Sequence, residues 1–331
     1  MLKLLTLGKG FPGGNRLTMP FLLGEKLLRW LNRGVNSLVF QPDTLPPASP
    51  AKKRYGVLGS PIAHSLSPAM QEAGFSALGL PAEYLRVEIP MGGLAEALPR
   101  LHAAGFHGWN CTLPHKEAMF ALCSETDAAA RESGTVNTVV VSEKGLRGHS
   151  TDADGWEDAV AEAWQIDLPG QRVLLLGCGG VGRTLAFRLA QRGCRHLRLA
   201  NRTSPKATQL AEKLSSKKSP VSVVPWRPAE LSQAVQDSDL LIQATPLGLA
   251  AADPLPVPEN CLHPGLRIYD TVYHRDWTPL VRAARARHLP ALDGLGMLLH
   301  QGARALSIWT GRPAPLVEMR TALAQAAGRP V

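Results

Sequence analysis

The stretch Arg172-Val-Leu-Leu-Leu-Gly-Cys-Gly-Gly-Val-Gly-Arg183 joins a short apolar run to three glycines at G-x-G-x-x-G spacing. The run Val173–Leu176 is typical of a parallel strand buried on both faces. Gly177 would allow a tight turn, Gly179 would let the backbone approach a pyrophosphate, and Gly182 would let helix and strand pack closely. The N–H groups of the following helix would face the phosphates. We therefore predict a dinucleotide-binding turn.

The residues after the next strand indicate which dinucleotide it is. An NAD-binding chain usually carries Asp or Glu about 20 residues past the glycines, where it bonds the ribose 2′-OH. Here the strand His196–Ala200 is followed by Asn201 and Arg202, and Lys206 lies one helical turn further on. An arginine can bind a 2′-phosphate that an acid would repel. The pattern favours NADP over NAD.

Composition sets broad limits on the remaining function classes. The chain has 331 residues, a length typical of two domains. No apolar run approaches the ~20 residues of a membrane span, so we predict no membrane partner. The net charge is +9, but 27 basic and 25 acidic residues follow Arg54, so we predict no nucleic-acid partner. The five cysteines and ten histidines form no metal-ligand pattern, so we predict no metal and reduced thiols.

Residues 1–50 are predicted to be a poorly ordered N-terminal extension. Leu22–Leu31 could form a short amphipathic helix, and residues 41–50 read as a proline-rich linker. Three interpretations stay open, in this order: a disordered tail or upstream start, with Met19 as another start; an organelle transit segment; and a surface-binding helix. The expected location is the cytoplasm, ahead of an organelle.

Strands and helices alternate from Tyr55 onward, and this predicts a two-domain α/β fold with a mainly parallel sheet in the first half. We expect a substrate domain at 51–153, completed by C-terminal helices within 295–331. A Rossmann-like, doubly wound NADP-binding domain is expected at 154–294. Ser67 is expected to cap a helix that Pro68 opens.

Polar side chains in the first half follow predicted strands, where open α/β sheets bind their ligands. Ser65 and Ser67 flank a loop that enters a helix N-terminus, which suits a carboxylate. The others are Asn110, Thr112, Lys116, Asn137, Thr151 and Asp152. Together they suit a small polyhydroxylated acid. Taken singly, a lysine such as Lys116 is more often a surface residue, and Asp152 more often a cap for a helix from Gly155 onward.

Eight motifs in order from residue 55 to the C-terminus make the chain resemble the shikimate dehydrogenase family. They are Gly59-Ser-Pro-Ile-Ala-His-Ser-Leu-Ser-Pro68, Asn110-Cys-Thr-Leu-Pro-His-Lys116, Val136-Asn-Thr138, Ser150-Thr-Asp152, Gly177-Cys-Gly-Gly-Val-Gly182, Asn201-Arg-Thr203, Ala244-Thr-Pro-Leu-Gly248 and Asp293-Gly-Leu-Gly-Met-Leu298. The first 50 residues lie outside the resemblance. It implies reversible, NADPH-dependent reduction of 3-dehydroshikimate to shikimate, in chorismate and aromatic amino-acid biosynthesis.

The resemblance also implies roles for individual residues. Lys116 would be the catalytic general acid and base, paired with Asp152. Ser65 and Ser67 would hold the substrate carboxylate. The rest of the substrate site would be Asn110, Thr112, Asn137, Tyr273 and Gln301. The cofactor would be held by Gly177, Gly179, Gly180, Val181, Gly182, Asn201, Arg202, Thr203, Lys206, Thr245, Gly294 and Met297.

Two positions depart from the family pattern, and several alternatives stay open. Ser150 stands where the family usually has Asn, and Lys206 where Arg is common, so local bonding is expected to differ. One alternative is a quinate/shikimate dehydrogenase with relaxed substrate or NAD use. Another is a non-catalytic NADP-binding regulator of the same fold. A small-molecule substrate is the predicted partner, and a monomer or homodimer the predicted state.

Overall fold

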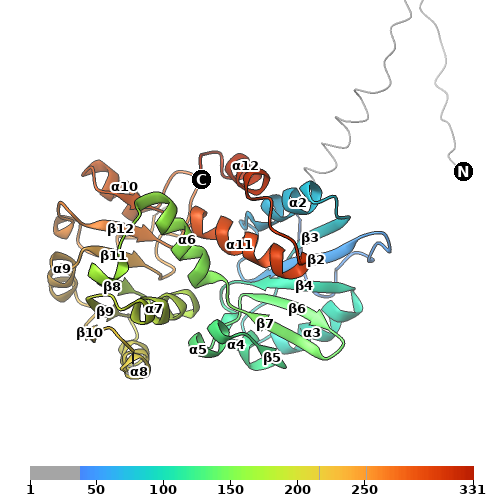
Figure 1. Cartoon of the computed structure of the whole chain (residues 1–331), viewed down its shortest axis with the longest axis horizontal. Helices are drawn as coiled ribbons and strands as arrows, with labels where there is room; N and C mark the ends of the chain where they lie inside the picture. The colour runs from blue at the N-terminus through green and yellow to red at the C-terminus, as the bar shows by residue number, and fades with distance from the viewer. Residues whose placement is uncertain (1–37, 216, 251) are drawn as a thin grey trace, which may run out of the picture. The chain divides into compact units, whose positions relative to one another are not determined.

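The computed structural model describes residues 38–331 except 216 and 251. This part of the chain is built on two β-sheets, each covered by helices (Figure 1). The fold is mixed α/β with mainly parallel sheets, as predicted. The first sheet comes from the N-terminal half of the described residues and the second from the following part of the chain.

The first sheet has, among the described residues, seven strands in the order β1-β3-β2-β4-β6-β7-β5. Their bounds are Val39–Phe40 (β1), Lys53–Gly59 (β2), Ala82–Glu88 (β3), Phe106–Cys111 (β4), Glu125–Thr126 (β5), Thr138–Ser142 (β6) and Gly145–His149 (β7). The four strands from β1 to β4 are parallel, and β6 with β7 forms an antiparallel hairpin. Helices of this half are α2 (Ser67–Ala77), α3 (Leu94–Ala103), α4 (Lys116–Leu122) and α5 (Ala128–Ser133).

The second sheet is parallel throughout the described residues and follows the order β10-β9-β8-β11-β12-β13. Its strands are Arg172–Leu176 (β8), His196–Ala200 (β9), Val221–Val224 (β10), Leu240–Gln243 (β11), Arg267–Asp270 (β12) and Ala291–Leu292 (β13). Its helices are α7 (Gly180–Arg192), α8 (Ser204–Leu214), α9 (Pro228–Gln236) and α10 (Pro279–Ala286). This is the doubly wound order, which reverses between β8 and β11 and places a ligand crevice at their carboxyl ends.

Strand β8 is buried on both faces, as its continuous apolar sequence predicts. Val173 and Leu175 belong to one hydrophobic core, and Leu174 and Leu176 belong to the core on the other face. Because alternate residues of a strand point to opposite faces, a run without polar residues can only be accommodated between two layers of helices. The sequence therefore places the glycine turn in the middle of the second sheet.

Helices α6 (Asp152–Trp164) and α11 (Leu295–Thr310) pack against each other and lie between the two sheets in Figure 1. Helix α11 also packs on α2, and so does α12 (Leu316–Ala327), so the C-terminal helices contact the first half. Trp309 Nε1 donates to the Val139 carbonyl at 2.9 Å. Gly108 permits this approach, because a Cβ there would lie 2.6 Å from that nitrogen.

The expected boundary at residue 50 is wrong for the described residues. Val39 and Phe40 pair with β3 at the edge of the first sheet. Arg54, 1% exposed, donates to the carbonyls of Pro46 and Pro47 at 2.8 and 2.9 Å. A buried guanidinium requires several acceptors, and these carbonyls supply them. Residues 39–50 therefore belong to the first half. The predicted helix Leu22–Leu31 and the start at Met19 lie outside the described residues.

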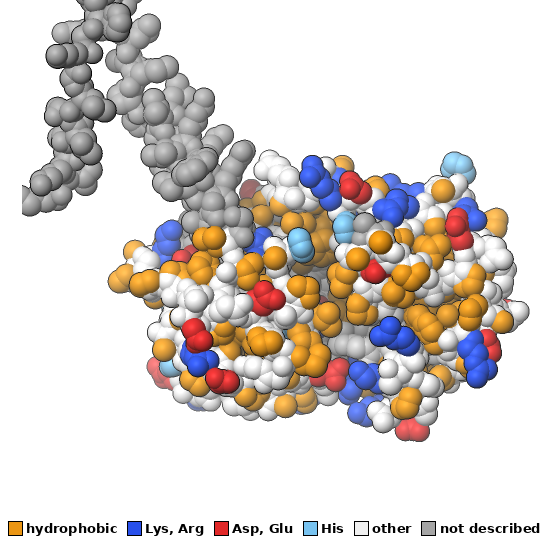
Figure 2. Space-filling model, turned by 180° about the vertical axis from the view of Figure 1, so that it is seen from behind, with side chains coloured by type: hydrophobic (Ala, Val, Ile, Leu, Met, Phe, Trp, Pro, Cys, Tyr) orange, Lys and Arg blue, Asp and Glu red, His pale blue; other side chains and the backbone are white. Residues whose placement is uncertain are grey.

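The expected cap at Ser67 is also wrong. Helix α2 begins with Ser67 itself, and Leu66 occupies the cap position without a side-chain cap bond. Helix α6 likewise begins at Asp152, so this carboxylate does not serve as the cap before Gly155. Within the described range, no helix has the length and apolar character needed to cross a membrane. On the face in Figure 2, basic and acidic side chains are interspersed.

Candidate active site

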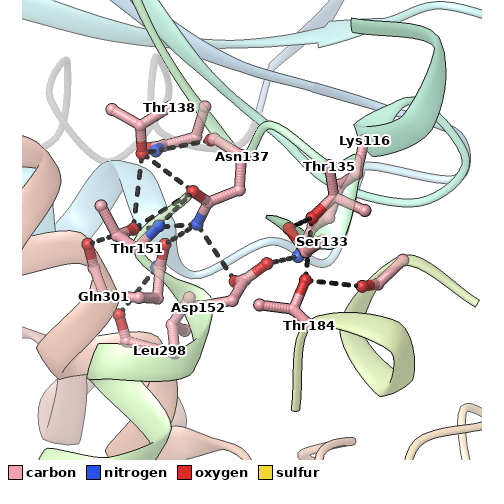
Figure 3. Close-up of polar contacts among 12 residues, drawn as sticks. Lys116, Ser133, Thr135, Asn137, Thr138, Thr151, Asp152, Thr184, Leu298 and Gln301 are labelled. Atoms are coloured by element: carbon pink, nitrogen blue, oxygen red, sulfur yellow. Dashed lines mark hydrogen bonds and ion pairs between the residues drawn. The ribbon is translucent and has the colours of Figure 1, made fainter. Parts of the chain in front are cut away.

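Lys116 and Asp152, which lie 36 residues apart in the sequence, form a buried ion pair (Figure 3). Each is the first residue of a helix, α4 or α6, and each follows a strand of the first sheet. Lys116 Nζ lies 2.5 Å from Asp152 Oδ2, and the two residues are 9% and 3% exposed. A buried ion pair is stable only when its remaining polar atoms are bonded. Such a lysine holds a proton at a fixed point shielded from bulk water.

The second oxygen of Asp152 is held by Asn137. Asn137 Nδ2 lies 3.0 Å from Asp152 Oδ1, 2.9 Å from Thr151 Oγ1 and 3.1 Å from Gln301 Oε1 (Figure 3). Its Oδ1 accepts from the Thr151 backbone N–H at 2.8 Å. Gln301 comes from α11, and Gly155 lets this helix approach, because a Cβ there would lie 2.5 Å from the Gln301 nitrogen. The amide groups fix the orientation of the carboxylate.

Asn110 extends this network across β4. Its Nδ2 donates to the Asn137 carbonyl at 3.0 Å and to Thr138 Oγ1 at 2.9 Å, and Tyr84 donates to its Oδ1 at 2.7 Å. The predicted residues Lys116, Asp152, Asn110, Asn137 and Gln301 are therefore brought together. Thr112 is half-buried at the end of β4, and its hydroxyl makes no hydrogen bond to the described residues.

Tyr273, from the segment after β12, lies beside the loop of the first half that carries Ser65 and Ser67. The hydroxyl of Tyr273 forms a hydrogen bond with the backbone of Leu66, and burial raises the pKa of this hydroxyl. Ser65 Oγ lies 3.4 Å from the Ser67 nitrogen. Two serines and a phenol beside a helix N-terminus can bind a carboxylate.

Arg86 contacts this loop too, and the sequence did not single it out. From β3 its Nε and Nη2 donate to the Ser65 carbonyl at 2.9 and 2.5 Å. Burial lowers the pKa of its guanidinium, while the charges of Tyr273 and Glu72 raise it. The signal in the sequence was a basic residue between two apolar residues, Leu85 and Val87, near the end of the strand.

The glycine turn after β8 is closely packed where α7 meets the strand and is open at Gly179. Gly177 has a φ of +97°, which only glycine adopts readily. A Cβ on Gly182 would lie 2.0 Å from the Gly177 carbonyl oxygen, so no side chain fits where α7 meets the strand. Gly179 has no atom within 4 Å of a Cβ position and leaves the turn open. Gly180 lies against Lys116, whose Cβ is 3.2 Å from its own Cβ position.

The polar residues after β9 divide into two groups. Asn201 Oδ1 accepts from the Cys178 backbone N–H, and its Nδ2 donates to the Thr203 carbonyl, both at 2.9 Å. Asn201 therefore shapes the glycine turn with its side chain. Arg202, Thr203 and Lys206 are exposed, and Arg202 makes no ion pair or side-chain hydrogen bond with the described residues. These groups are free to bind a 2′-phosphate. NADP therefore fits the residues present.

The other predicted cofactor residues lie at the glycine turn, at the start of α11 or in the core beside β8. Thr245 Cγ2 lies 2.9 Å from the Cβ position of Gly177, and Val181 is half-buried in the first turn of α7. Gly294 precedes α11, where a Cβ would lie 2.2 Å from the Thr271 carbonyl oxygen. Met297 is 5% exposed and packs in the core beneath β8.

Ser150, the departure from the expected Asn, has a buried hydroxyl with no hydrogen-bond partner among the described residues. Its backbone N–H donates to Asp127 Oδ2 at 3.3 Å. No group of His, Cys, Asp and Glu within the described range could hold a metal ion.

Three family models match successive parts of the chain. Residues 57–139 match the shikimate dehydrogenase substrate binding domain, residues 159–250 match shikimate / quinate 5-dehydrogenase, and residues 294–324 match the shikimate 5'-dehydrogenase C-terminal domain.

Whole relatives agree with these matches. Shikimate dehydrogenase (NADP(+)) of Rubrobacter xylanophilus is 44% identical over 81% of this chain and 94% of its own. The shikimate 5-dehydrogenase of Thermus thermophilus, solved with NADP(H) and shikimate, is 36% identical with a TM-score of 0.73, over 83% of this chain and 99% of its own. Quinate dehydrogenase of Corynebacterium glutamicum, solved with NAD, is 29% identical with a TM-score of 0.74, over the same shares.

Proposed function

The chain belongs to the shikimate dehydrogenase family, and we propose that Lys116 and Asp152 carry out the proton transfer of its reaction. It is an NADP-dependent oxidoreductase that interconverts 3-dehydroshikimate and shikimate in the shikimate pathway. The observation that carries the assignment of roles is the buried pair at 2.5 Å, which lies against the glycine turn through Gly180.

In the reductive direction, bound NADPH supplies a hydride to the ketone carbon. The ammonium of Lys116 is positioned to stabilise the negative charge that develops on the carbonyl oxygen and to donate a proton to it from Nζ. In the oxidative direction the same nitrogen accepts the hydroxyl proton. Asp152 directs Nζ, and Asn137 directs Asp152, so the lysine does not need to reorganise during the reaction. Positioned proton transfer of this kind is worth about 10²- to 10⁴-fold in rate.

We place the carboxylate of the substrate at Ser65, Ser67 and Tyr273, and its ring hydroxyls at Asn110, Thr112, Asn137 and Gln301. The first sheet would thus bind the substrate and the second sheet the cofactor. Support comes from the polar side chains of the first half, from Tyr273 after β12, which bonds the Leu66 backbone, and from the open glycine turn of the second half. Arg202, Thr203 and Lys206 would hold the 2′-phosphate of NADP, with Asn201 shaping the turn that they flank.

We further propose that the enzyme works in the cytoplasm as a monomer or homodimer. All five cysteines are free thiols, and four of them are buried, which is compatible with a reducing compartment. Size-exclusion chromatography with light scattering measures the oligomeric state. A stable tetramer would contradict this proposal.

Initial rates with shikimate and with quinate, each with NADP and with NAD, test the function. We expect the highest kcat/KM for shikimate with NADP, because Arg202 is free to bind the 2′-phosphate that only NADP carries. Equal or higher kcat/KM for quinate with NAD would replace the substrate and cofactor assignment. Absence of turnover with all four pairs would replace it with a non-catalytic role.

A further inference from the structure

Three hydroxyl groups form a line between the first half and helix α7 (Figure 3). Ser133 Oγ lies 2.8 Å from Thr135 Oγ1, and Thr135 Oγ1 lies 2.8 Å from Thr184 Oγ1. Ser133 ends α5 and Thr135 follows it, whereas Thr184 belongs to the first turns of α7. The three residues are 1%, 1% and 3% exposed. A buried hydrogen bond therefore joins the two halves outside the predicted site residues.

Both ends of the line meet a backbone carbonyl. Ser133 Oγ lies 2.8 Å from the Ala129 oxygen, and Thr184 Oγ1 lies 2.9 Å from the Gly180 oxygen. A hydroxyl carries one proton, so three protons serve four contacts. Removing the hydroxyl of Thr135 leaves Ser133 and Thr184 each donating to its own carbonyl. That substitution breaks the bond between the halves and leaves no buried donor without an acceptor.

The two halves also approach each other closely on either side of these three hydroxyl groups. Gly134 lies between Ser133 and Thr135 with a φ of +65°, and a Cβ there would be 3.0 Å from Arg183 Nη2. At the other end, Gly180 lies against the side chain of Lys116. Gly180 therefore makes both contacts: its carbonyl accepts from Thr184, and it lies against the side chain of Lys116.

We propose that Thr135 and Thr184 are positioning residues, which form a hydroxyl latch that holds the glycine turn against Lys116. The proposal rests on the proposed function, since what the latch aligns is the cofactor turn and the proton donor. Neither residue touches the reacting atoms. Their effect passes through Gly180, whose position sets the distance between the cofactor turn and the lysine.

The variant Thr135→Val tests the latch, because valine keeps the shape of threonine and removes the hydroxyl. One hydrogen bond of this kind corresponds to a factor of about 2 to 13 in the equilibrium that it supports. We expect kcat to fall by that factor, and the dissociation constant of shikimate for the free enzyme to stay unchanged, because no substrate residue is altered. Thr135→Ser should retain wild-type turnover.

Ser133→Ala is the matched control. It removes a hydroxyl from the same line, but leaves Thr135 donating to Thr184 and Thr184 donating to Gly180. We expect unchanged kcat. Thr184→Val removes the same bond between the halves together with the contact to the Gly180 carbonyl, so it should lose at least as much turnover as Thr135→Val. The double variant should fall no further than Thr184→Val alone, because the bond between the halves is already absent. Three results would overturn the latch: equal losses of kcat in Ser133→Ala and Thr135→Val, full turnover in Thr135→Val, or additive losses of kcat in the double variant.

Amide hydrogen exchange separates failure of the latch from failure of the proposed function. The amides of residues 182–184 should exchange about 2- to 13-fold faster in Thr135→Val than in Ser133→Ala, with or without turnover. Equal exchange would overturn the latch even in an active enzyme. A wild-type protein without shikimate turnover would overturn the function alone, and the exchange result would still decide the latch.

Discussion

Replacing Lys116 by methionine should separate the proton-transfer role of this residue from its role in stability. Methionine is close to lysine in length and cannot donate a proton. The variant leaves Asp152 buried, 3% exposed, with Asn137 Nδ2 at 3.0 Å. Removing one partner of a buried ion pair destabilises a protein by about 3–5 kcal/mol. Loss of a positioned acid and base lowers turnover by about 10²- to 10⁴-fold.

The double variant Lys116→Met/Asp152→Asn distinguishes the two effects. Its buried amide carries no charge, so most of the lost free energy of unfolding should return, while the proton donor is still absent. We expect turnover to remain low in both variants. Unfolding is measured with urea, and turnover from NADPH formation with saturating shikimate. Lys144→Met, at an exposed hairpin position, is the control and should match the wild type in both assays.

Two results would refute the reasoning. Turnover of Lys116→Met within tenfold of the wild type would remove this lysine from proton transfer. Recovery of turnover together with stability in the double variant would show that the single substitution acted through folding. The pair would then be a structural ion pair.

Three further outcomes follow from individual residues. Burial raises the pKa of Asp270 from 3.8 to about 7, so the folded protein binds this proton more tightly than the unfolded chain, and the resulting stability is present below pH 3.8 and is lost as pH rises through 7. Asp270→Asn should therefore make the free energy of unfolding, measured with urea, less dependent on pH between these values. An unchanged pH dependence in this variant would contradict the shift. Arg202→Ala should raise KM for NADPH about tenfold or more and leave KM for NADH unchanged, as measured by initial rates, and equal effects on both would remove the 2′-phosphate role. Burial raises the pKa of Cys178 to about 12, so mass spectrometry after iodoacetamide treatment at pH 8 should find it unlabelled in the native protein and labelled after unfolding; rapid native labelling would contradict its burial.

Most strands of the second sheet were predictable because each is encoded by its own local pattern. Strand β9 has the bounds predicted for it, His196–Ala200, and β8 leads into the glycine turn as expected. A strand buried on both faces must be apolar at every position, which makes it visible in a single sequence. The two-residue strands β1, β5 and β13 and helices α5 and α9 were not predicted. Strands this short depend on pairing with distant residues.

The sequence by itself determined the chemistry of this protein: a glycine turn without the usual acid, a basic residue after β9, and lysine, aspartate and amides at strand ends. These features are local, since each needs only a residue type and its position relative to a strand or helix. Which of them act together was decided by tertiary structure alone. Three contacts show this: the 2.5 Å ion pair of Lys116 and Asp152, the hydrogen bond from Arg86 to the Ser65 carbonyl, and the hydrogen bond between Thr135 and Thr184. They join residues that are 36, 21 and 49 positions apart. Such contacts depend on how two sheets and three helices pack, and no local pattern along the chain specifies that packing.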